Sequence, residues 1–203
     1  MEAREKIFSK ITAATEGLAD NTELPSIDEI RSVRSKLVPG DVDVDTLVEA
    51  FARRLEEVNG KVVYGWDALA DFLKKEGVSK PYIDPKVLAE YGRDAGEFTT
   101  QFPRSEVDEI DCGITLASMG IAELGTLILK DGDTTNRLAA LAPWVHVAAL
   151  SRSKIVPSLL EAVERLDEDP SCIFVTGPSK TADIEGILIE GVHGPGVQVC
   201  LIL

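Results

Sequence analysis

Apolar residues recur in the N-terminal third of the chain with the spacing of amphipathic helices. The longest stripe runs through Val44, Leu47, Val48, Phe51, Leu55 and Val58. Its three- and four-residue intervals predict a helix, and Asn59-Gly60 is typical of a helix end. A shorter stripe predicts an earlier helix over about residues 4–18. It consists of Ile7, Ile11, Ala14 and Leu18.

Short apolar runs alternate with helical patterns through the rest of the chain. The predicted strands are KVVYG (61–65), PYID (81–84), WVHVAAL (144–150), CIFVT (172–176) and VQVCLIL (197–203). The predicted helices are WDALADFLKKEG (66–77), VPSLLEAVERL (156–166) and TADIEGILIE (181–190). The apolar runs do not alternate with polar residues, which is typical of strands covered on both faces. This order of elements predicts an α/β fold with a mainly parallel sheet and flanking helices.

The middle of the chain departs from that order. Two apolar runs, Gly113–Ala117 and Thr126–Lys130, flank a turn punctuated by glycines. The intervening residues are too few for an ordinary helical crossover, so we expect an antiparallel or strongly bent pair of strands. A polar, proline-containing stretch, Ala19–Asp43, separates the first predicted helix from the rest. We therefore divide the chain into an N-terminal helix and arm, residues 1–43, and an α/β domain, residues 44–203.

Composition excludes several classes of partner. The 203 residues carry a net charge of −14, which argues against a nucleic-acid groove or an anionic membrane surface but leaves room for a small anion held locally. The N-terminus mixes charged and apolar residues, unlike a signal peptide, and the longest nearly apolar stretch, 138–150, is too short to span a bilayer. We expect a cytoplasmic chain without membrane insertion.

The cysteines argue against a cluster or metal within this chain. Cys112, Cys172 and Cys200 are widely spaced and form no C-x-x-C motif, so we expect buried free thiols in reducing cytosol. The segment 131–136 (DGDTTN) is similar to a calcium loop, but it lacks the central glycine and the closing glutamate and is interpreted as a polar loop. We therefore expect no metal, iron–sulfur or other cofactor bound by this chain itself.

The segment 176–196 (TGPSKTADIEGILIEGVHGPG) is the densest in glycine and hydroxyl groups. If a helix begins near Thr181, the preceding loop offers N–H groups and hydroxyls for a small anion. The loop contributes Thr176, Gly177, Ser179 and Lys180. Alternatively, Thr181 only caps that helix and no ligand is bound. The pattern of a P-loop is absent, and both interpretations stay open.

Three further side chains are candidates for function or for structure. His193 lies between Gly191 and Gly194 in a rigid loop, where it is either a turn residue or a functional one. His146 lies inside an apolar strand and is interpreted as structural. Glu123 lies among apolar residues in the glycine-bracketed turn, where it is either partly buried with a raised pKa or simply accepts a backbone N–H.

Three segments resemble the LUD-domain family of lactate-utilisation proteins, in particular its protein C-like members. They are GITLASMGIAELGTLIL (113–129), RLAALAPWVHVAALSRSKIVPSL (137–159) and residues 176–196, and together they cover about residues 113–203. The family usually has Glu-Thr-Gly-Thr where this chain has Glu123, Leu124, Gly125 and Thr126. The Leu124 difference removes a hydroxyl from this turn. The resemblance implies a fold similar to the ribose-5-phosphate isomerase and CoA-transferase group.

The resemblance also implies a function and partners. It implies an accessory subunit of a system that oxidises L-lactate to pyruvate, with iron–sulfur clusters in partner subunits and a small anionic ligand on this chain. The alternative is a free-standing enzyme similar to CoA-transferases or cyclo-ligases, with Glu123 as catalytic residue. The expected ligand-binding residues are Thr126, Arg137, Thr176, Gly177, Ser179, Lys180, Thr181, His193 and Gly194. We expect Glu123, Arg137, Lys180 and His193 to converge near one edge of a sheet that residues 113–203 largely form.

Overall fold

The computed structural model describes residues 3–16, 25–35, 42–166, 171–182 and 187–203. Contacts divide the chain into two units, Met1–Asp41 and Val42–Leu203. The first unit contains helices α1 (Ala3–Thr15) and α2 (Ile27–Ser35). The first predicted helix is therefore present, and the predicted arm contains a second helix. Residues 17–24 and 36–41 of that arm lie outside the described residues.

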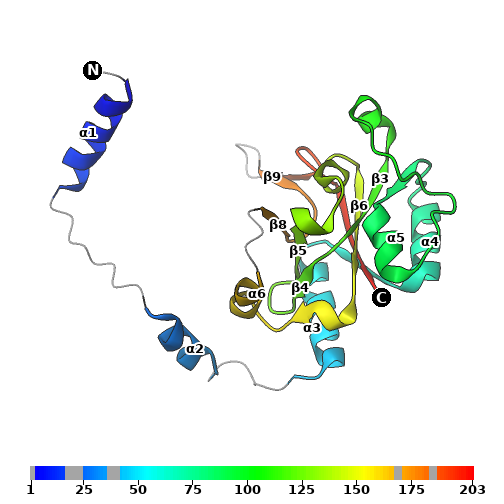
Figure 1. Ribbon diagram of the computed structural model, residues 1–203, viewed down its shortest axis with the longest axis horizontal. Coiled ribbons are helices and arrows are strands. Elements are labelled where there is room, and N and C mark those ends of the chain that lie inside the picture. The colour runs from blue at the N-terminus through cyan, green and yellow to red at the C-terminus, as the bar shows by residue number, and fades with distance from the viewer. Residues whose placement is uncertain (1–2, 17–24, 36–41, 167–170, 183–186) are drawn as a thin grey trace. The chain divides into compact units, whose positions relative to one another are not determined.

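A five-stranded parallel sheet forms the centre of the second unit (Figure 1). Its strands, in spatial order, are β1 (Lys61–Tyr64), β11 (Val197–Ile202), β6 (Val145–Leu150), β3 (Cys112–Leu116) and β2 (Pro81–Ile83). Every neighbouring pair is parallel. The α/β fold with a mainly parallel sheet is thus confirmed. Strands β3 and β6 are buried along their whole length, whereas β1, also expected to be covered on both faces, is partly exposed.

Two helices cover one face of this sheet. Helix α4 (Gly65–Lys75) follows β1 and ends before Gly77, which has φ +72°. Helix α5 (Pro85–Tyr91) follows β2 and is capped by Asp84, with Pro85 in its first turn. Leu69, Leu73 and Val87 pack against strand residues that include Ile114, Val147 and Leu201. Burial of this apolar surface holds the helical layer on the sheet.

A second sheet and helix α3 (Val44–Glu57) cover the opposite face (Figure 1). Its strands, in spatial order, are β7 (Ile155–Val156), β4 (Met119–Ile121), β5 (Thr126–Lys130) and β8 (Cys172–Val175). Phe51 and Leu55 of α3 pack with Leu127 and Leu129 of β5 and with Leu150 of β6. Helix α6 (Leu159–Arg165) packs on this second sheet. The parallel sheet therefore has helices on one face and a mixed layer on the other.

The remaining elements are short. The 3-10 helices are η1 (Arg104–Glu109), η2 (Asp131–Asp133), η3 (Arg137–Ala140) and η4 (Arg152–Lys154). Strands β9 (Lys180–Ala182) and β10 (Leu188–Glu190) pair as an antiparallel two-stranded sheet. Of these, η3 matters most for function because it packs on β3 and carries Arg137.

The prediction that Gly113–Ala117 and Thr126–Lys130 pair with each other is wrong. The first run is β3 of the parallel sheet, and β5 pairs antiparallel with β4 instead. The chain changes sheets between Ala117 and Ser118, because the N–H of Ala117 bonds to Ala149 in one sheet and that of Ser118 bonds to Ile128 in the other. Residues 113–203 therefore contribute to two main sheets rather than to most of one.

The prediction of a helix over residues 181–190 is also wrong. Thr181 lies in β9 opposite Ile189 of β10, and residues 183–186 lie outside the described residues. Backbone bonds hold the ends of the hairpin, since Ser179 donates to Pro195 and Gly191 donates to Ser179. The apolar residues of such a short segment fit the period of a helix and that of a strand equally well. Hydrogen bonds to backbone groups farther along the chain therefore determine that it forms strands.

Candidate functional site

Three buried polar side chains lie on the face of the parallel sheet that meets the second sheet. They are Thr115 of β3, His146 of β6 and Gln198 of β11, each at most 1% exposed. Register aligns His146 with Gln198 on one side and with Gly113, two residues before Thr115, on the other. The three side chains therefore point to the same face. The Thr115 hydroxyl lies 2.8 Å from His146 Nε2, and His146 Nδ1 lies 2.8 Å from Gln198 Oε1.

The hydrogen bonds of Gln198 determine which nitrogen of His146 carries the proton. Gln198 Nε2 donates to the carbonyl of Val199, so its Oε1 faces the imidazole and accepts from Nδ1–H. Burial lowers the pKa of His146 to about 4, against a smaller opposing effect of the Gln198 bond. The ring is therefore neutral near pH 7. Its Nε2 accepts, and the Thr115 hydroxyl donates.

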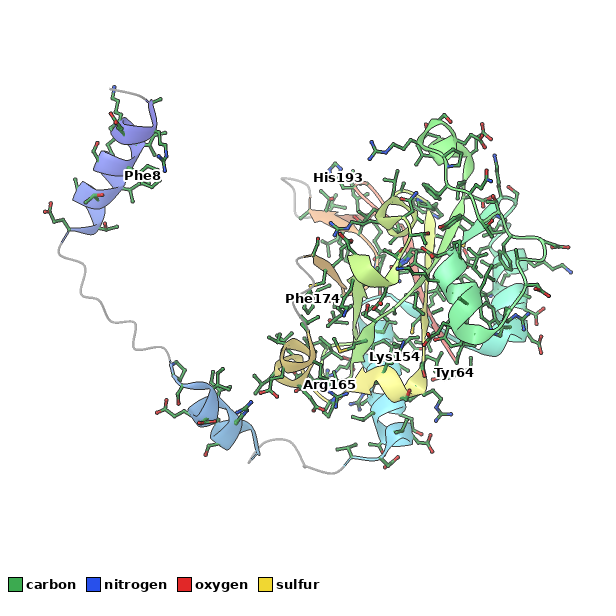
Figure 2. All side chains as sticks on the ribbon, viewed as in Figure 1. Phe8, Tyr64, Lys154, Arg165, Phe174 and His193 are labelled. Carbon is green, nitrogen blue, oxygen red and sulfur yellow. The ribbon has the colours of Figure 1, made fainter. Side chains whose placement is uncertain are left out.

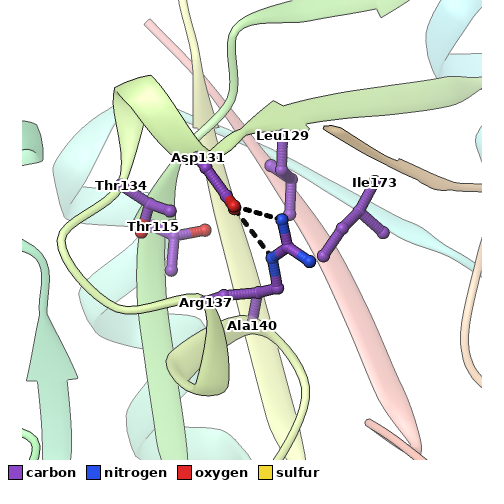
Figure 3. Close-up of a pocket in the computed structure, with 7 residues that line it drawn as sticks. All are labelled: Thr115, Leu129, Asp131, Thr134, Arg137, Ala140 and Ile173. Atoms are coloured by element: carbon purple, nitrogen blue, oxygen red, sulfur yellow. Dashed lines mark hydrogen bonds and ion pairs between the residues drawn. The ribbon is translucent and has the colours of Figure 1, made fainter. Parts of the chain in front are cut away.

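A small cavity opens in front of Thr115, between the two sheets (Figure 3). Its lining residues are Thr115, Leu129, Asp131, Thr134, Arg137, Ala140 and Ile173. The space measures about 200 Å³ including its open mouth, and little of it is wider than a water molecule. Because ligand pockets typically measure about 300–1,000 Å³, this cavity is smaller than a usual ligand site and has room for at most about one water molecule unless a side chain moves.

Arg137 and Asp131 form a bidentate ion pair at the cavity (Figure 3). Arg137 Nε donates to Asp131 Oδ1 at 2.7 Å, and Nη2 bonds to the other carboxylate oxygen and to the Ser171 hydroxyl. Both charged side chains are partly exposed. The planar guanidinium is the group best suited to bind a carboxylate through two parallel bonds. Arg137, expected from the sequence to bind a ligand, therefore lies in the cavity and holds an internal carboxylate.

Asp84 fixes the loop that carries Asp131 and Thr134. It is fully buried, and its carboxylate accepts from the Thr134 hydroxyl at 2.8 Å and from the Thr135 N–H and hydroxyl at 2.7 and 2.9 Å. The N–H of Lys86 donates to its second oxygen. These donors suit an ionised carboxylate, which is an acceptor on every side. The segment 131–136 is thus a loop organised around a buried acid.

Within the described residues, no three His, Cys, Asp or Glu side chains lie close enough together to hold a metal ion. Cys112 and Cys200 are fully buried in separate core clusters, and burial raises the pKa of both thiols. Cys172, on β8 of the second sheet, is partly buried. The polar side chains that line the cavity are those of Thr115, Asp131, Thr134 and Arg137, and all four can form hydrogen bonds.

The predicted ligand residues of the segment 176–196 form a second, separate cluster. The hydroxyls of Thr126 and Thr176 bond at 2.7 Å. Gly177 has φ +80° and lies so close to Val58 that a Cβ would sit 2.6 Å from its carbonyl oxygen. Lys180 Nζ donates to that same carbonyl at 2.8 Å and lies 3.6 Å from Glu190. These groups join the loop to the end of α3.

No helix N-terminus exists at Thr181 to bind an anion, because β9 begins at Lys180. Ser179 lies beside Gly194, where a Cβ would be 3.2 Å from the Ser179 side chain. His193 is exposed in the loop between β10 and β11 (Figure 2). This segment therefore closes the β9–β10 hairpin onto the domain, and its one cation is engaged by Val58 and Glu190.

Glu123 also has a structural partner. Its side chain is exposed, not partly buried, and it accepts from the N–H of Leu159, the first residue of α6, at 2.9 Å. Of the two interpretations left open, the backbone acceptor therefore fits the structure. Glu123 precedes β5 and Arg137 follows it, so the length of that strand, about 13 Å, separates their loops. The expected convergence of Glu123 and Arg137 is not seen.

The sequence predicted Arg137 but missed most of its neighbours. Thr115, Gln198 and Asp84 are not singled out by the pattern, the segment 131–136 is interpreted there only as a polar loop, and His146 only as structural. A signal was present, since each of the three central strands carries a polar residue within its apolar run. A polar residue that interrupts a buried strand needs a partner, and three such strands suggest that they partner one another.

The structure is that of an α/β protein with an arginine-containing cavity between two sheets. Comparison of the sequence with known proteins identifies its family. The sequence model of the LUD domain matches residues 73–203. The lactate utilization protein C of Halalkalibacterium halodurans is 31% identical over 175 residues, or 79% of this chain and 70% of that protein. The same-named protein of Bacillus licheniformis is 32% identical over 183 residues, or 83% of this chain and 72% of that protein. The chain therefore belongs to the LUD domain family.

A solved structure supports the fold. The crystal structure of a DUF162 family protein from Deinococcus radiodurans matches with a TM-score of 0.58 at 20% identity, covering 80% of this chain and all of that chain. Among the described helices, none is both long and apolar enough to cross a bilayer.

Proposed function

We propose that this chain acts in lactate utilisation as a cytoplasmic accessory subunit that binds a small carboxylate in the Arg137 cavity. The observation that carries the proposal is its similarity, over about four-fifths of its length, to relatives named lactate utilization protein C. The cavity supplies a position for the ligand, because Arg137 already binds a carboxylate there.

Iron–sulfur clusters, in this proposal, belong to partner subunits. Oxidation of lactate to pyruvate releases two electrons, which a carrier must accept. Clusters are held by several cysteine thiolates placed together. In this chain, Cys112 and Cys200 are buried in separate cores, and Cys172 lies on the other sheet. Side chains arranged in this way are not placed to share one cluster, which supports the proposal that partner subunits carry the clusters.

An anaerobic pull-down of the tagged chain from lactate-grown cells tests this role. We expect the captured material to contain iron and to oxidise L-lactate, while the chain purified alone contains no stoichiometric iron. The control is the same capture from cells that express the tag on an unrelated protein. Stoichiometric iron on the isolated chain, or normal growth on lactate after deletion of its gene, would refute the proposal.

The ion pair suggests how the carboxylate enters. The cavity is nearly filled, so a ligand carboxylate must take the place of Asp131 on Arg137. Asp131 is partly exposed and lies at the end of β5, so its side chain can turn to solvent. This exchange replaces one bidentate pair with another and costs little besides the ordering of the ligand.

Substitution of the two partners has opposite expected effects on affinity for L-lactate. Arg137→Ala removes a charge-assisted bond worth about 1.5–3 kcal/mol, so affinity should fall by about 10- to 100-fold. Asp131→Ala removes the internal competitor, whose partly exposed pair is worth about 1 kcal/mol, so affinity should rise about fivefold. Isothermal titration calorimetry of the full chain measures both changes.

Arg165→Ala is the matched control for this titration. Arg165 also pairs with a carboxylate, that of Glu161, and it lies on α6 outside the cavity. We expect its loss to leave lactate affinity unchanged. Equal affinities for wild type and the Arg137 variant would remove the carboxylate site from the proposal.

A further inference from the structure

We infer that the cavity distinguishes 2-hydroxy carboxylates from 2-oxo carboxylates, because its two threonine hydroxyls can accept but not donate hydrogen bonds to a ligand. The inference rests on the proposed carboxylate site at Arg137 and names its ligand class. It concerns the group on the carbon beside the carboxylate, which is where lactate and pyruvate differ.

The Thr115 hydroxyl donates its hydrogen to His146, whose own orientation is set by Gln198. Gln198 fixes the proton of His146 on Nδ1, so Nε2 is an acceptor, and the Thr115 hydrogen points to it at a heavy-atom distance of 2.8 Å. A hydroxyl has one hydrogen and two lone pairs. With the hydrogen used, the Thr115 oxygen has only lone pairs left for a ligand in the cavity that this residue lines (Figure 3).

The Thr134 hydroxyl also donates its hydrogen, in this case to Asp84. Its hydroxyl donates to the buried Asp84 carboxylate at 2.8 Å, and its oxygen accepts only a long bond of 3.4 Å from the N–H of Asn136 among the described contacts. Both oxygens of Asp84 accept from backbone N–H groups, those of Lys86 and Thr135, so Asp84 is the acceptor in its bond with Thr134. The second hydroxyl of the cavity is therefore also an acceptor.

Each polar side chain of the cavity can therefore act toward a ligand either as a hydrogen-bond donor or as an acceptor, but not as both. Arg137 donates, and Thr115, Thr134 and Asp131 accept. A 2-hydroxy carboxylate matches this arrangement, since its carboxylate accepts from Arg137 and its hydroxyl donates to a threonine oxygen. A 2-oxo carboxylate brings another lone pair against those oxygens. An acceptor facing an acceptor in a water-poor site is unfavourable, so the oxo acid should bind more weakly.

Calorimetric titration of the full chain with L-lactate and with pyruvate tests the inference. We expect wild type to prefer L-lactate by about fivefold or more, the lower limit of what a buried polar group left without its partner costs in binding. Thr115→Ser, which keeps the hydroxyl, should retain the preference. Thr115→Val, which keeps the shape without the hydroxyl, should reduce it to about threefold or less.

Nitrogen NMR of His146 provides a test that needs no variant. We expect the neutral tautomer with the proton on Nδ1 at pH 7. A proton on Nε2 would overturn the inference, because Thr115 would then be free to donate. Equal affinity of wild type for the two acids would overturn it while the Arg137 site stands. If neither acid binds, the carboxylate site of the proposed function fails and this inference fails with it.

Discussion

His146 shows how much of a residue's role lies outside its own neighbourhood in the sequence. Its surroundings, Val145 to Leu150, predict a buried strand, and the side chain is indeed fully buried. Its two hydrogen-bond partners lie 31 and 52 residues away, on β3 and β11. Neither is visible from the local pattern. The same residue therefore has a predictable position and an unpredictable role in orienting Thr115.

The low pKa of His146 predicts a loss of stability in mild acid. Its pKa is about 4 in the folded chain and about 6.5 when unfolded, so between these values the unfolded state binds more protons. Stability contributed by the neutral, buried ring is complete above pH 6.5 and is lost as the pH falls toward 4. The full shift corresponds to about 3 kcal/mol of unfolding free energy.

Denaturant unfolding of wild type and His146→Gln at several pH values measures this contribution. Carboxylates titrate in the same range in both proteins, so the difference between their slopes isolates the histidine. We expect the wild type to lose more stability than the variant between pH 6.5 and 4. Parallel curves would show that His146 does not titrate with a depressed pKa.

At the scale of elements, local pattern identified most strands and helices but failed where a short segment fits two periods. The helix expected at Thr181 is a strand because β10 and the backbone around Ser179 supply its partners. The antiparallel pair expected in the middle exists, but β4 rather than β3 provides the second strand. Both errors concern pairing, which depends on contacts between segments rather than on composition.

The β4–β5 hairpin offers a sharp test of packing at this scale. Gly125 has φ +63°, and a Cβ there would lie 2.3 Å from the backbone nitrogen of Leu55 in α3. Gly125→Ala should therefore lower the unfolding free energy by about 3 kcal/mol, from left-handed strain together with steric overlap. Thermal or denaturant unfolding measures the loss.

Gly77→Ala is the matched control for this hairpin test. Gly77 has φ +72°, but nothing lies within 4 Å of the added Cβ. It should lose only about 1 kcal/mol, the contribution of the left-handed backbone alone. Similar losses at the two positions would mean that the hairpin does not press on α3 as the structure shows.

At the scale of the whole molecule, charge and unit organisation set the conditions for any ligand or partner. The net charge of −14 opposes the approach of small anions, although salt screens this repulsion beyond about 8 Å under physiological conditions. Arg137 therefore has to act at short range. Within the first unit, α1 buries none of its residues, and helices of this length are marginal by themselves in water. The second unit has its own extensive core.

Arg137 became a candidate only through the resemblance to the LUD-domain family, whereas the class of fold and the order of most elements could be predicted from the chain itself. These follow from local causes, since periodicity, turn residues and capping residues act within a few positions. The sequence also shows that the three cysteines are widely spaced along the chain and form no C-x-x-C motif.

Which polar groups contact one another follows from the packing of the whole domain. The Thr115–His146–Gln198 network depends on the spatial order of β3, β6 and β11, strands that are far apart along the chain. The cavity depends on the chain passing from the first sheet to the second after Ala117. The contacts of Lys180 with the Val58 carbonyl and with Glu190 likewise join segments that are distant in the sequence. Such pairings depend on which apolar surfaces are buried against each other. The free energy of this burial is gained only when the whole domain packs, so no single segment determines it.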